Sequence, residues 1–358
     1  MKQRWLVSLG VLSPLIAVVW LTTIPAAGQA PAGAPSTAAA PGTPAVARAN
    51  RAPAKADTLP RTPDGQPDLQ GFWTNSTYTP LERPRNVTKE FYTKEEAAAI
   101  EKQAAAQESE QTEPGTIADV HYDFSQFGLD KNQNTLARTL RTSLIVDPTD
   151  GRLPSLTPVG QRRAAERAEL AKRVGRWDAA QSNELDDRCI IMAGAGPPML
   201  NSGYNSNYQI VQAPGYVMIL VEMIHDVRII PLDRRPALPG NIRQWMGDSR
   251  GHWEGDTLVV ETTNFNGKNP LRGSSENMRV TERFTRVDAD TISYKFTVED
   301  ESTWTRPWTA ELPMRKTTGP LFEHACHEGN YGLFNTLVGA RLEDKRAAEE
   351  AAKKGSKP

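Results

Sequence analysis

A series of short strand-like segments between residues 207 and 315 constrains the fold more than any other feature of the chain. The segments are rich in β-branched and aromatic residues, and most are bounded by Gly, Pro, Asn or Asp. They are Tyr208–Ala213, Tyr216–Met223, Val227–Leu232, Asp256–Thr263, Met278–Thr285, Thr291–Val298 and Trp304–Ala310. This pattern predicts a mainly β protein with an antiparallel sheet.

Apolar and polar residues alternate most regularly in the hairpin between Met278 and Val298. Side chains alternate across a strand, so the two strands share an apolar face and a basic, hydroxyl-rich face. The apolar face carries Met278, Val280, Phe284, Ile292, Tyr294, Phe296 and Val298. Such alternation is typical of an antiparallel sheet with one solvated side. Glu282 is an acid at an apolar position, which marks it as a candidate for function.

Two helices are expected between the first strands. The segment Thr93 to Gln111 has a capping box, Thr93 with Glu96, and an interior of Ala, Glu, Lys and Gln. A second helix is expected to begin with Pro158 at its first position and to end near Arg173. We therefore expect one β-rich domain over residues 59–340, with a helical insertion around 93–175. Residues 245–256, with two Trp and several Gly, are expected to form an ordered loop.

The N-terminus predicts export. Lys2 and Arg4 precede an apolar run from Trp5 to Ile24, followed by small residues, as in a signal peptide over residues 1–30. An uncleaved membrane anchor is the alternative, and it would be the only membrane attachment. Residues 31–58 are dominated by Ala, Pro, Gly and Thr and predict a disordered linker. The protein is therefore expected in the periplasm or outside the cell. At the other end of the chain, residues 341–358 are expected to form a charged tail.

Charge and motifs exclude several function classes. The net charge is −1, so no basic field is present to attract nucleic acid. The run Gly194-Ala195-Gly196 is not a dinucleotide fingerprint, because the third glycine is missing and Pro197-Pro198 blocks the following helix. We expect no cofactor, and the sequence does not predict an oligomeric state.

The two cysteines, Cys189 and Cys326, are expected to form a disulfide, since an even count in an exported chain favours one. Cys326 lies between His324 and His327, so a metal site is the alternative. Without the thiolate the two histidines make a weak site, and no metal is predicted.

Two acid-centred groups are candidates for chemistry. Glu222 is expected among apolar neighbours at the end of a strand, with His225 beside it as a possible proton relay. Glu282 is expected to pair in the interior with Arg306, which lies between Trp304 and Trp308, and such a pair could also orient a polar ligand head. In both groups a purely structural pairing is the competing interpretation.

Aromatic residues supply the candidate ligand-binding set. Aromatic side chains that line a concave surface favour apolar or sugar-like ligands, although ordinary core packing is the competing interpretation. The set comprises Trp73, Trp245, Trp253, Trp304 and Trp308, together with Arg306 between the last two tryptophans.

Several segments resemble a large group of uncharacterised exported bacterial proteins. They are Gly71–Trp73, Thr142–Pro148, Trp245–Asp248, Trp253–Val260 and Cys326–Asn330. The resemblance implies export and no particular activity. Gly71-Phe72-Trp73 is also similar to the Gly-x-Trp opening of lipocalin-like barrels, in which the Trp plugs one end. The fold class is thus an antiparallel lipocalin-like barrel or a meander sheet.

These observations predict an exported protein that binds a small apolar or amphipathic molecule inside a β-barrel-like domain. An enzyme in the same scaffold is the first alternative: a lyase, isomerase or hydrolase that uses Glu222, His225 or Glu282 as acid and base. An envelope interaction protein without a small-molecule site is the second.

Overall fold

The computed structural model describes residues 59–108, 135–175, 177–192, 194–201 and 204–355. The expected signal peptide over residues 1–30 and the linker over 31–58 lie outside the described residues. So do residues 109–134 of the helical insertion and the last three residues of the tail.

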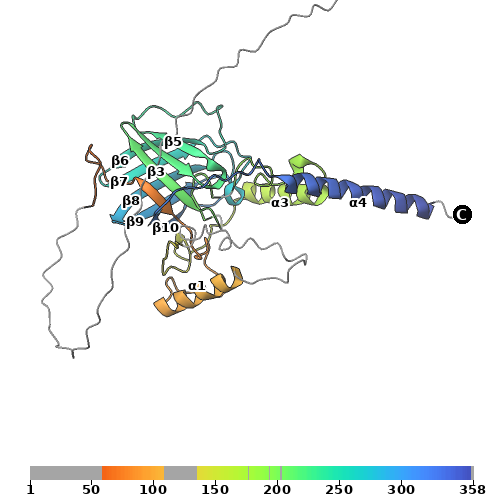
Figure 1. Ribbon diagram of the computed structural model, residues 1–358, viewed down its shortest axis with the longest axis horizontal. Helices are drawn as coiled ribbons and strands as arrows, with labels where there is room; N and C mark the ends of the chain where they lie inside the picture. The colour runs from red at the N-terminus through yellow and green to blue at the C-terminus, as the bar shows by residue number, and fades with distance from the viewer. Residues whose placement is uncertain (1–58, 109–134, 176, 193, 202–203, 356–358) are drawn as a thin grey trace, which may run out of the picture. The chain divides into compact units, whose positions relative to one another are not determined.

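One antiparallel sheet dominates the described residues (Figure 1). Its strands are β1 (Gly71–Thr74), β2 (Ile145–Asp147), β3 (Asn207–Ala213), β4 (Tyr216–Val221), β5 (Val227–Pro231), β6 (Asp248–Glu254), β7 (Thr257–Thr263), β8 (Arg279–Asp288), β9 (Thr291–Glu299) and β10 (Trp308–Thr317). Their hydrogen-bonded order is β5-β4-β3-β1-β10-β9-β8-β7-β6, and β2 pairs with β10 beside this path. The predicted antiparallel, β-rich fold is confirmed.

The sheet is open, because the hydrogen-bonded path ends at β5 and at β6. Each neighbouring pair along the nine-strand path is antiparallel, so β5 and β6 run in the same direction. Side chains nevertheless bring these strands together, since Arg228 Nη2 lies 3.4 Å from Ser249 Oγ. A Cβ on Gly251 would lie 2.8 Å from Ile230 Cγ2 and 2.7 Å from Leu232 Cδ2. We call this gap between β5 and β6 the seam.

The predicted alternation in β8 and β9 is confirmed, and it forms the core. Inward residues of both strands are buried, while the residues between them are partly or fully exposed. The rings of Phe284, Tyr294, Phe296, Trp308 and Trp304 follow one another with centroid separations of 4.9, 5.6, 5.7 and 5.8 Å. Tilted and edge-on contacts at this spacing are the favoured aromatic geometry. The inner face of the sheet is therefore filled by side chains.

The structure corrects the sequence-based prediction at one missed strand and at two strand boundaries. Residues 248–254 form β6 rather than a loop, and β6 pairs with β7 through the turn at Gly255, where φ is +57°. β10 begins at Trp308 rather than Trp304, because Pro307 cannot donate a ladder hydrogen bond. β4 ends at Val221, two residues before the expected end, because the chain turns at Glu222.

Within the described ranges, three α-helices accompany the sheet. α1 (Lys94–Glu108) begins with the predicted capping box, in which Thr93 N donates to Glu96 Oε2 at 2.8 Å. α3 (Pro158–Arg173) begins as predicted, with Thr157 accepting a hydrogen bond from Gly160 N. α4 (Tyr331–Gly355) starts ten residues before the expected tail. Short 3-10 turns lie at Ala180–Ser182, Met223–His225 and Leu271–Gly273.

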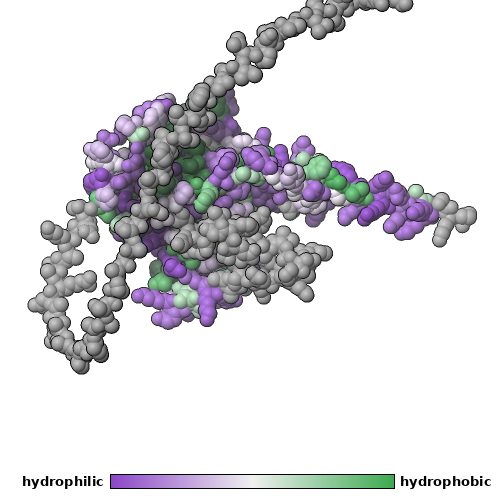
Figure 2. Space-filling model, viewed as in Figure 1, coloured by the Kyte–Doolittle hydropathy of each residue, from purple (hydrophilic) through white to green (hydrophobic). Residues whose placement is uncertain are grey.

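Apolar residues are also exposed on α4. Tyr331, Phe334, Val338 and Leu342 are more than a third exposed, and Figure 2 shows hydrophobic residues among hydrophilic ones along this helix. No helix in the described ranges combines the length and the apolar character needed to cross a bilayer.

Candidate functional site

A charged cluster lies inside the otherwise apolar core. Arg228 Nη1 on β5 donates to Glu282 Oε1 on β8 at 3.0 Å, and Arg228 Nη2 donates to the other carboxylate oxygen. Tyr294 Oη on β9 donates to Glu282 Oε1 at 2.7 Å and accepts from Met199 N at 2.8 Å. The side chains of Arg228 and Glu282 are 2% and 0% exposed, so this ion pair is fully removed from solvent.

Strand alternation positions this cluster. Glu282 lies between the inward positions of Val280 and Phe284, and Arg228 points inward from the edge strand while Val227 and Ile229 are exposed. Burial alone would lower the pKa of Arg228, but its attraction and hydrogen bonds to Glu282 outweigh burial and raise that pKa. Burial, followed by the Glu282 charge, raises the pKa of Tyr294 well above its ordinary value. Arg228 is therefore charged at neutral pH, and Tyr294 is protonated.

Glu222 and His225 lie in a different place from Glu282. Glu222 is buried, accepts from Asn207 Nδ2 at 2.6 Å and from Phe322 N at 3.3 Å, and follows β4 instead of continuing its face. His225 is exposed, and its Nδ1 lies 3.2 Å from the carbonyl oxygen of His324. These two residues hold the segment around Phe322 and His324 against the sheet, whereas Glu282 belongs to the Arg228 cluster.

The predicted disulfide between Cys189 and Cys326 is confirmed. Asn330 Nδ2 donates to Asp187 O at 2.8 Å and to Cys189 Sγ at 3.3 Å, which adds a second link across the bridge. Within the described ranges, no group of three or more His, Cys, Asp and Glu side chains could hold a metal ion. Burial, and then the nearby His225, lowers the pKa of His324, which favours its neutral form.

The expected interior pair of Glu282 with Arg306 is wrong. Arg306 is exposed and donates to Asp147 Oδ1 at 2.6 Å at the edge of β2. Arg306 lies in the turn before β10, outside the alternation that would have pointed it inward. The partner of Glu282 comes instead from β5, at the far end of the strand order.

The tryptophans separate into core and surface residues. Trp73, Trp304 and Trp308 are at most 2% exposed, and Trp73 Nε1 donates to Leu69 O at 2.9 Å. Trp253 is partly buried and packs against the core. Trp245 is 36% exposed, with Lys268 Nζ 6.0 Å from its ring centroid. Among the candidate ligand-binding tryptophans, Trp245 is the one that lines a cleft described below.

A cleft of about 340 Å³ opens beside Trp245, and we call it the Trp245 cleft. Three loops supply its walls: residues 191–192 with 194–201, residues 245–246 and residues 265–278. Most of the lining is apolar, from Ile191, Met192, Leu200, Met246, Phe265, Leu271 and Met278. Arg272, in the left-handed backbone region with φ +48°, is the cation among its lining residues.

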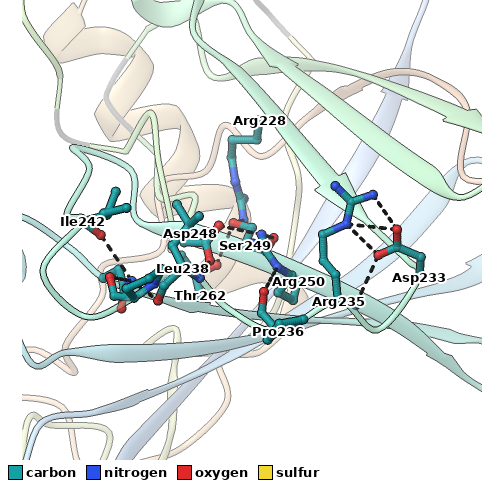
Figure 3. Close-up of polar contacts among 12 residues, drawn as sticks. Arg228, Asp233, Arg235, Pro236, Leu238, Ile242, Asp248, Ser249, Arg250 and Thr262 are labelled. Carbon is teal, nitrogen blue, oxygen red and sulfur yellow. Dashed lines mark hydrogen bonds and ion pairs between the residues drawn. The ribbon is translucent and has the colours of Figure 1, made fainter.

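Backbone geometry fixes the loop that carries Trp245. Asn264 Nδ2 donates to the carbonyl oxygens of Leu238, Pro239 and Ile242, at 2.8, 3.2 and 3.2 Å. Gly247 has φ +69°, and a Cβ there would lie 2.5 Å from Thr263 O, so glycine is required for this close approach. Figure 3 shows the loop around Leu238 and Ile242 beside Asp248 and Thr262. Trp245 is thus presented by an anchored loop.

A neighbouring cleft of about 580 Å³ runs along the seam. Val227 to Ile229 line one side, Gly247 to Ser249 line the other, and Trp245 and Met246 line this seam cleft as well as the Trp245 cleft. Arg243 lines the seam cleft, and its Nη1 donates to Phe265 O at 3.1 Å and to Glu276 O at 2.5 Å. The hydrogen-bonded Arg243 therefore lines the seam cleft, which adjoins the apolar Trp245 cleft.

Sequence reasoning selected Trp245 but missed the rest of this lining. Its members are distributed over loops separated by up to 87 positions, from Ile191 to Met278, and no periodicity joins them. The Pro197-Pro198 and Trp245–Asp248 segments were the available signals, because each combines ring-bearing residues with adjacent glycines.

Comparisons with known proteins found no relative of this chain. No family model matches it, and neither the curated proteins nor the solved structures contain a significant match.

Proposed function

We propose that this protein binds a small amphipathic molecule in the Trp245 cleft, outside the packed interior of the sheet. The observation that carries the proposal is Trp245, which is about a third exposed on an anchored loop and lines both the apolar Trp245 cleft and the seam cleft. Ligand sites are characteristically concave and mostly apolar, with a few placed polar groups and volumes of roughly 300–1,000 Å³. The Trp245 cleft, at about 340 Å³, meets that description.

The lining favours a ligand with an apolar body and an anionic head. Met192, Met246 and Met278 supply flexible, polarisable side chains that adapt to irregular apolar shapes. Arg272 supplies a charge to the Trp245 cleft, and Arg243 supplies one to the neighbouring seam cleft. A guanidinium group binds a carboxylate with two parallel hydrogen bonds.

We further infer that the strand arrangement is related to that of lipocalin-like barrels, although the ligand is proposed to bind outside the sheet. Support comes from the approach of β5 to β6 at the seam and from the buried Trp73 within β1. Filling of the inner face by aromatic side chains argues for a ligand at the outside of the sheet. Export to the periplasm or beyond is part of the proposal, and the disulfide supports it because disulfides persist in oxidising compartments.

The enzyme alternative receives less support from the geometry. Glu282 is committed to Arg228 and Tyr294 in the core, and Glu222 holds Asn207 and Phe322 N. Neither carboxylate lines the clefts beside Trp245. The envelope interaction protein remains the alternative if the cleft binds nothing.

Isothermal titration calorimetry with dodecanoate tests the proposal, with butanoate as the matched ligand of equal charge and shorter chain. We expect dodecanoate to bind with a negative heat-capacity change, because apolar surface is buried, and butanoate to bind far more weakly. Trp245→Ala should weaken dodecanoate binding about tenfold, which corresponds to about 1.4 kcal/mol. Tyr331→Ala, at a residue that is 72% exposed on α4, is the matched aromatic control. Equal affinities for the two ligands, or for wild type and Trp245→Ala, would refute the proposal.

A further inference from the structure

A third cleft, of about 520 Å³, lies on the outer face of β6, β7 and β8. The loop after β5 supplies Arg234 and Arg235, β6 supplies Arg250, and β8 supplies Arg279. We call it the arginine groove. The net charge of the whole chain is only −1. The four arginines of this groove therefore concentrate positive charge at one place, which the net charge does not reveal.

Two of these arginines are held in place by acids, as Figure 3 shows. Arg250 Nη1 donates to Asp248 Oδ1 at 2.5 Å and to Ser249 O at 2.8 Å. Arg235 Nε donates to the Asp233 carboxylate at 2.8 and 2.9 Å, and its Nη2 donates to Tyr216 Oη at 2.8 Å. Hydrogen bonds from Arg235 lower the pKa of Asp233 to about 2. These guanidinium groups are therefore oriented before any ligand arrives.

The other two arginines are not neutralised in this way. Within the ranges that the structure describes, neither Arg234 nor Arg279 has an ion-pair partner, and both are exposed. Arg234 also has φ +57°, a left-handed conformation that a long side chain rarely adopts. Backbone strain of this kind is concentrated at binding sites, where the surrounding structure maintains it.

We propose that the arginine groove binds the oxyanion of a polyhydroxylated molecule, such as a carboxylated or phosphorylated sugar. Guanidinium groups bind planar and tetrahedral oxyanions through paired hydrogen bonds, and Arg234 and Arg279 provide the unneutralised pair. Glu261 and Thr263 line the same groove and can accept hydrogen bonds from hydroxyl groups. A polar groove of this kind selects a charged, hydroxyl-rich ligand, whereas the Trp245 cleft selects an apolar one.

The experiment titrates the full protein with glucuronate, glucose 6-phosphate and glucose, and follows binding by calorimetry. Glucose is the matched neutral control, because it has the same ring without the oxyanion. Arg234→Gln/Arg279→Gln removes both unneutralised charges. Arg283→Gln is the matched variant, since Arg283 is on the same face of β8, pairs with Glu254 and does not line the groove.

We expect at least one charged sugar to bind more than tenfold more tightly than glucose, and the double variant to weaken it at least tenfold. Arg283→Gln should change the affinity less than twofold, and raising salt should weaken binding. Preference for glucuronate or for glucose 6-phosphate identifies the oxyanion. The inference is overturned if neither charged sugar binds, if glucose binds equally well, or if the double variant, shown to be folded by its circular dichroism, retains full affinity.

Discussion

Removal of Glu282 should destabilise the protein strongly, because it would leave Arg228 charged and unpaired in the core. The two side chains are 0% and 2% exposed, so neither charge can recover solvation without opening the sheet. Breaking one partner of such a buried pair costs about 3–5 kcal/mol. We expect Glu282→Leu and Arg228→Met each to lower the free energy of unfolding by that amount.

The double variant should lose less stability than the sum of the losses in Glu282→Leu and Arg228→Met. Replacement of a buried ion pair by apolar residues of similar volume is often neutral or stabilising by about 1–4 kcal/mol. Tyr294 would then lose its acceptor, and an unsatisfied buried hydroxyl costs about 1–3 kcal/mol. Arg228→Met/Glu282→Leu should therefore lie within about 3 kcal/mol of wild type, with a large favourable coupling in the double-mutant cycle.

Urea denaturation followed by circular dichroism measures these differences, provided that the slope with denaturant is unchanged among the variants. Arg306→Met is the control, because its ion pair with Asp147 is half exposed and should contribute at most about 1 kcal/mol. A loss below about 1 kcal/mol for Glu282→Leu, or simple additivity in the double variant, would refute the buried pair.

Three further outcomes follow from the structure. Gly251→Ala should lower the free energy of unfolding, measured in urea, by about 1–3 kcal/mol, because the added Cβ would lie 2.7 and 2.8 Å from side chains across the seam. Gly240→Ala is the control and should be nearly neutral, since open space surrounds Gly240; equal effects of the two variants would contradict a tight seam. Thiol titration of the denatured, unreduced protein should find no free thiol, and Cys189→Ser/Cys326→Ser should lose about 4–5 kcal/mol of stability; two free thiols would exclude the disulfide. Because the pKa of Tyr294 is raised in the folded protein, its contribution to the free energy of unfolding is fully present below the pKa of an unfolded tyrosine, near 10. Above that pH the contribution is lost at about 1.4 kcal/mol per pH unit, so the free energy of unfolding should fall less steeply with rising pH in Tyr294→Phe.

The periodic parts of the fold could be predicted from the sequence. Alternation between Met278 and Val298 correctly placed both faces of β8 and β9, because the spacing of two is a local property of a strand. The capping box at Thr93 and the Pro158 start were also local signals, and both helices begin there. β6 was missed because its Gly251 and its polar residues hide the alternation of a strand that packs on a close neighbour.

Long-range partners could not be predicted in this way. Arg228 is 54 positions from Glu282 and on a strand at the opposite end of the hydrogen-bonded order, so nothing local identifies the pair. Arg306 was selected because two nearby tryptophans suggested a strand, but Pro307 moved the start of β10 beyond it. The clefts depend on how loops meet at the seam, which the pattern of individual segments does not determine.

Native mass spectrometry of the protein purified from its own producing cells tests the central proposal most directly. We expect wild-type protein to carry a small amphipathic molecule, Trp245→Ala to carry much less of it, and Tyr331→Ala to carry the same amount. Two results would contradict the assignment of the Trp245 cleft as a binding site. In the first, wild-type protein carries no small-molecule adduct and also fails to bind dodecanoate. In the second, the amount of adduct is unchanged in Trp245→Ala.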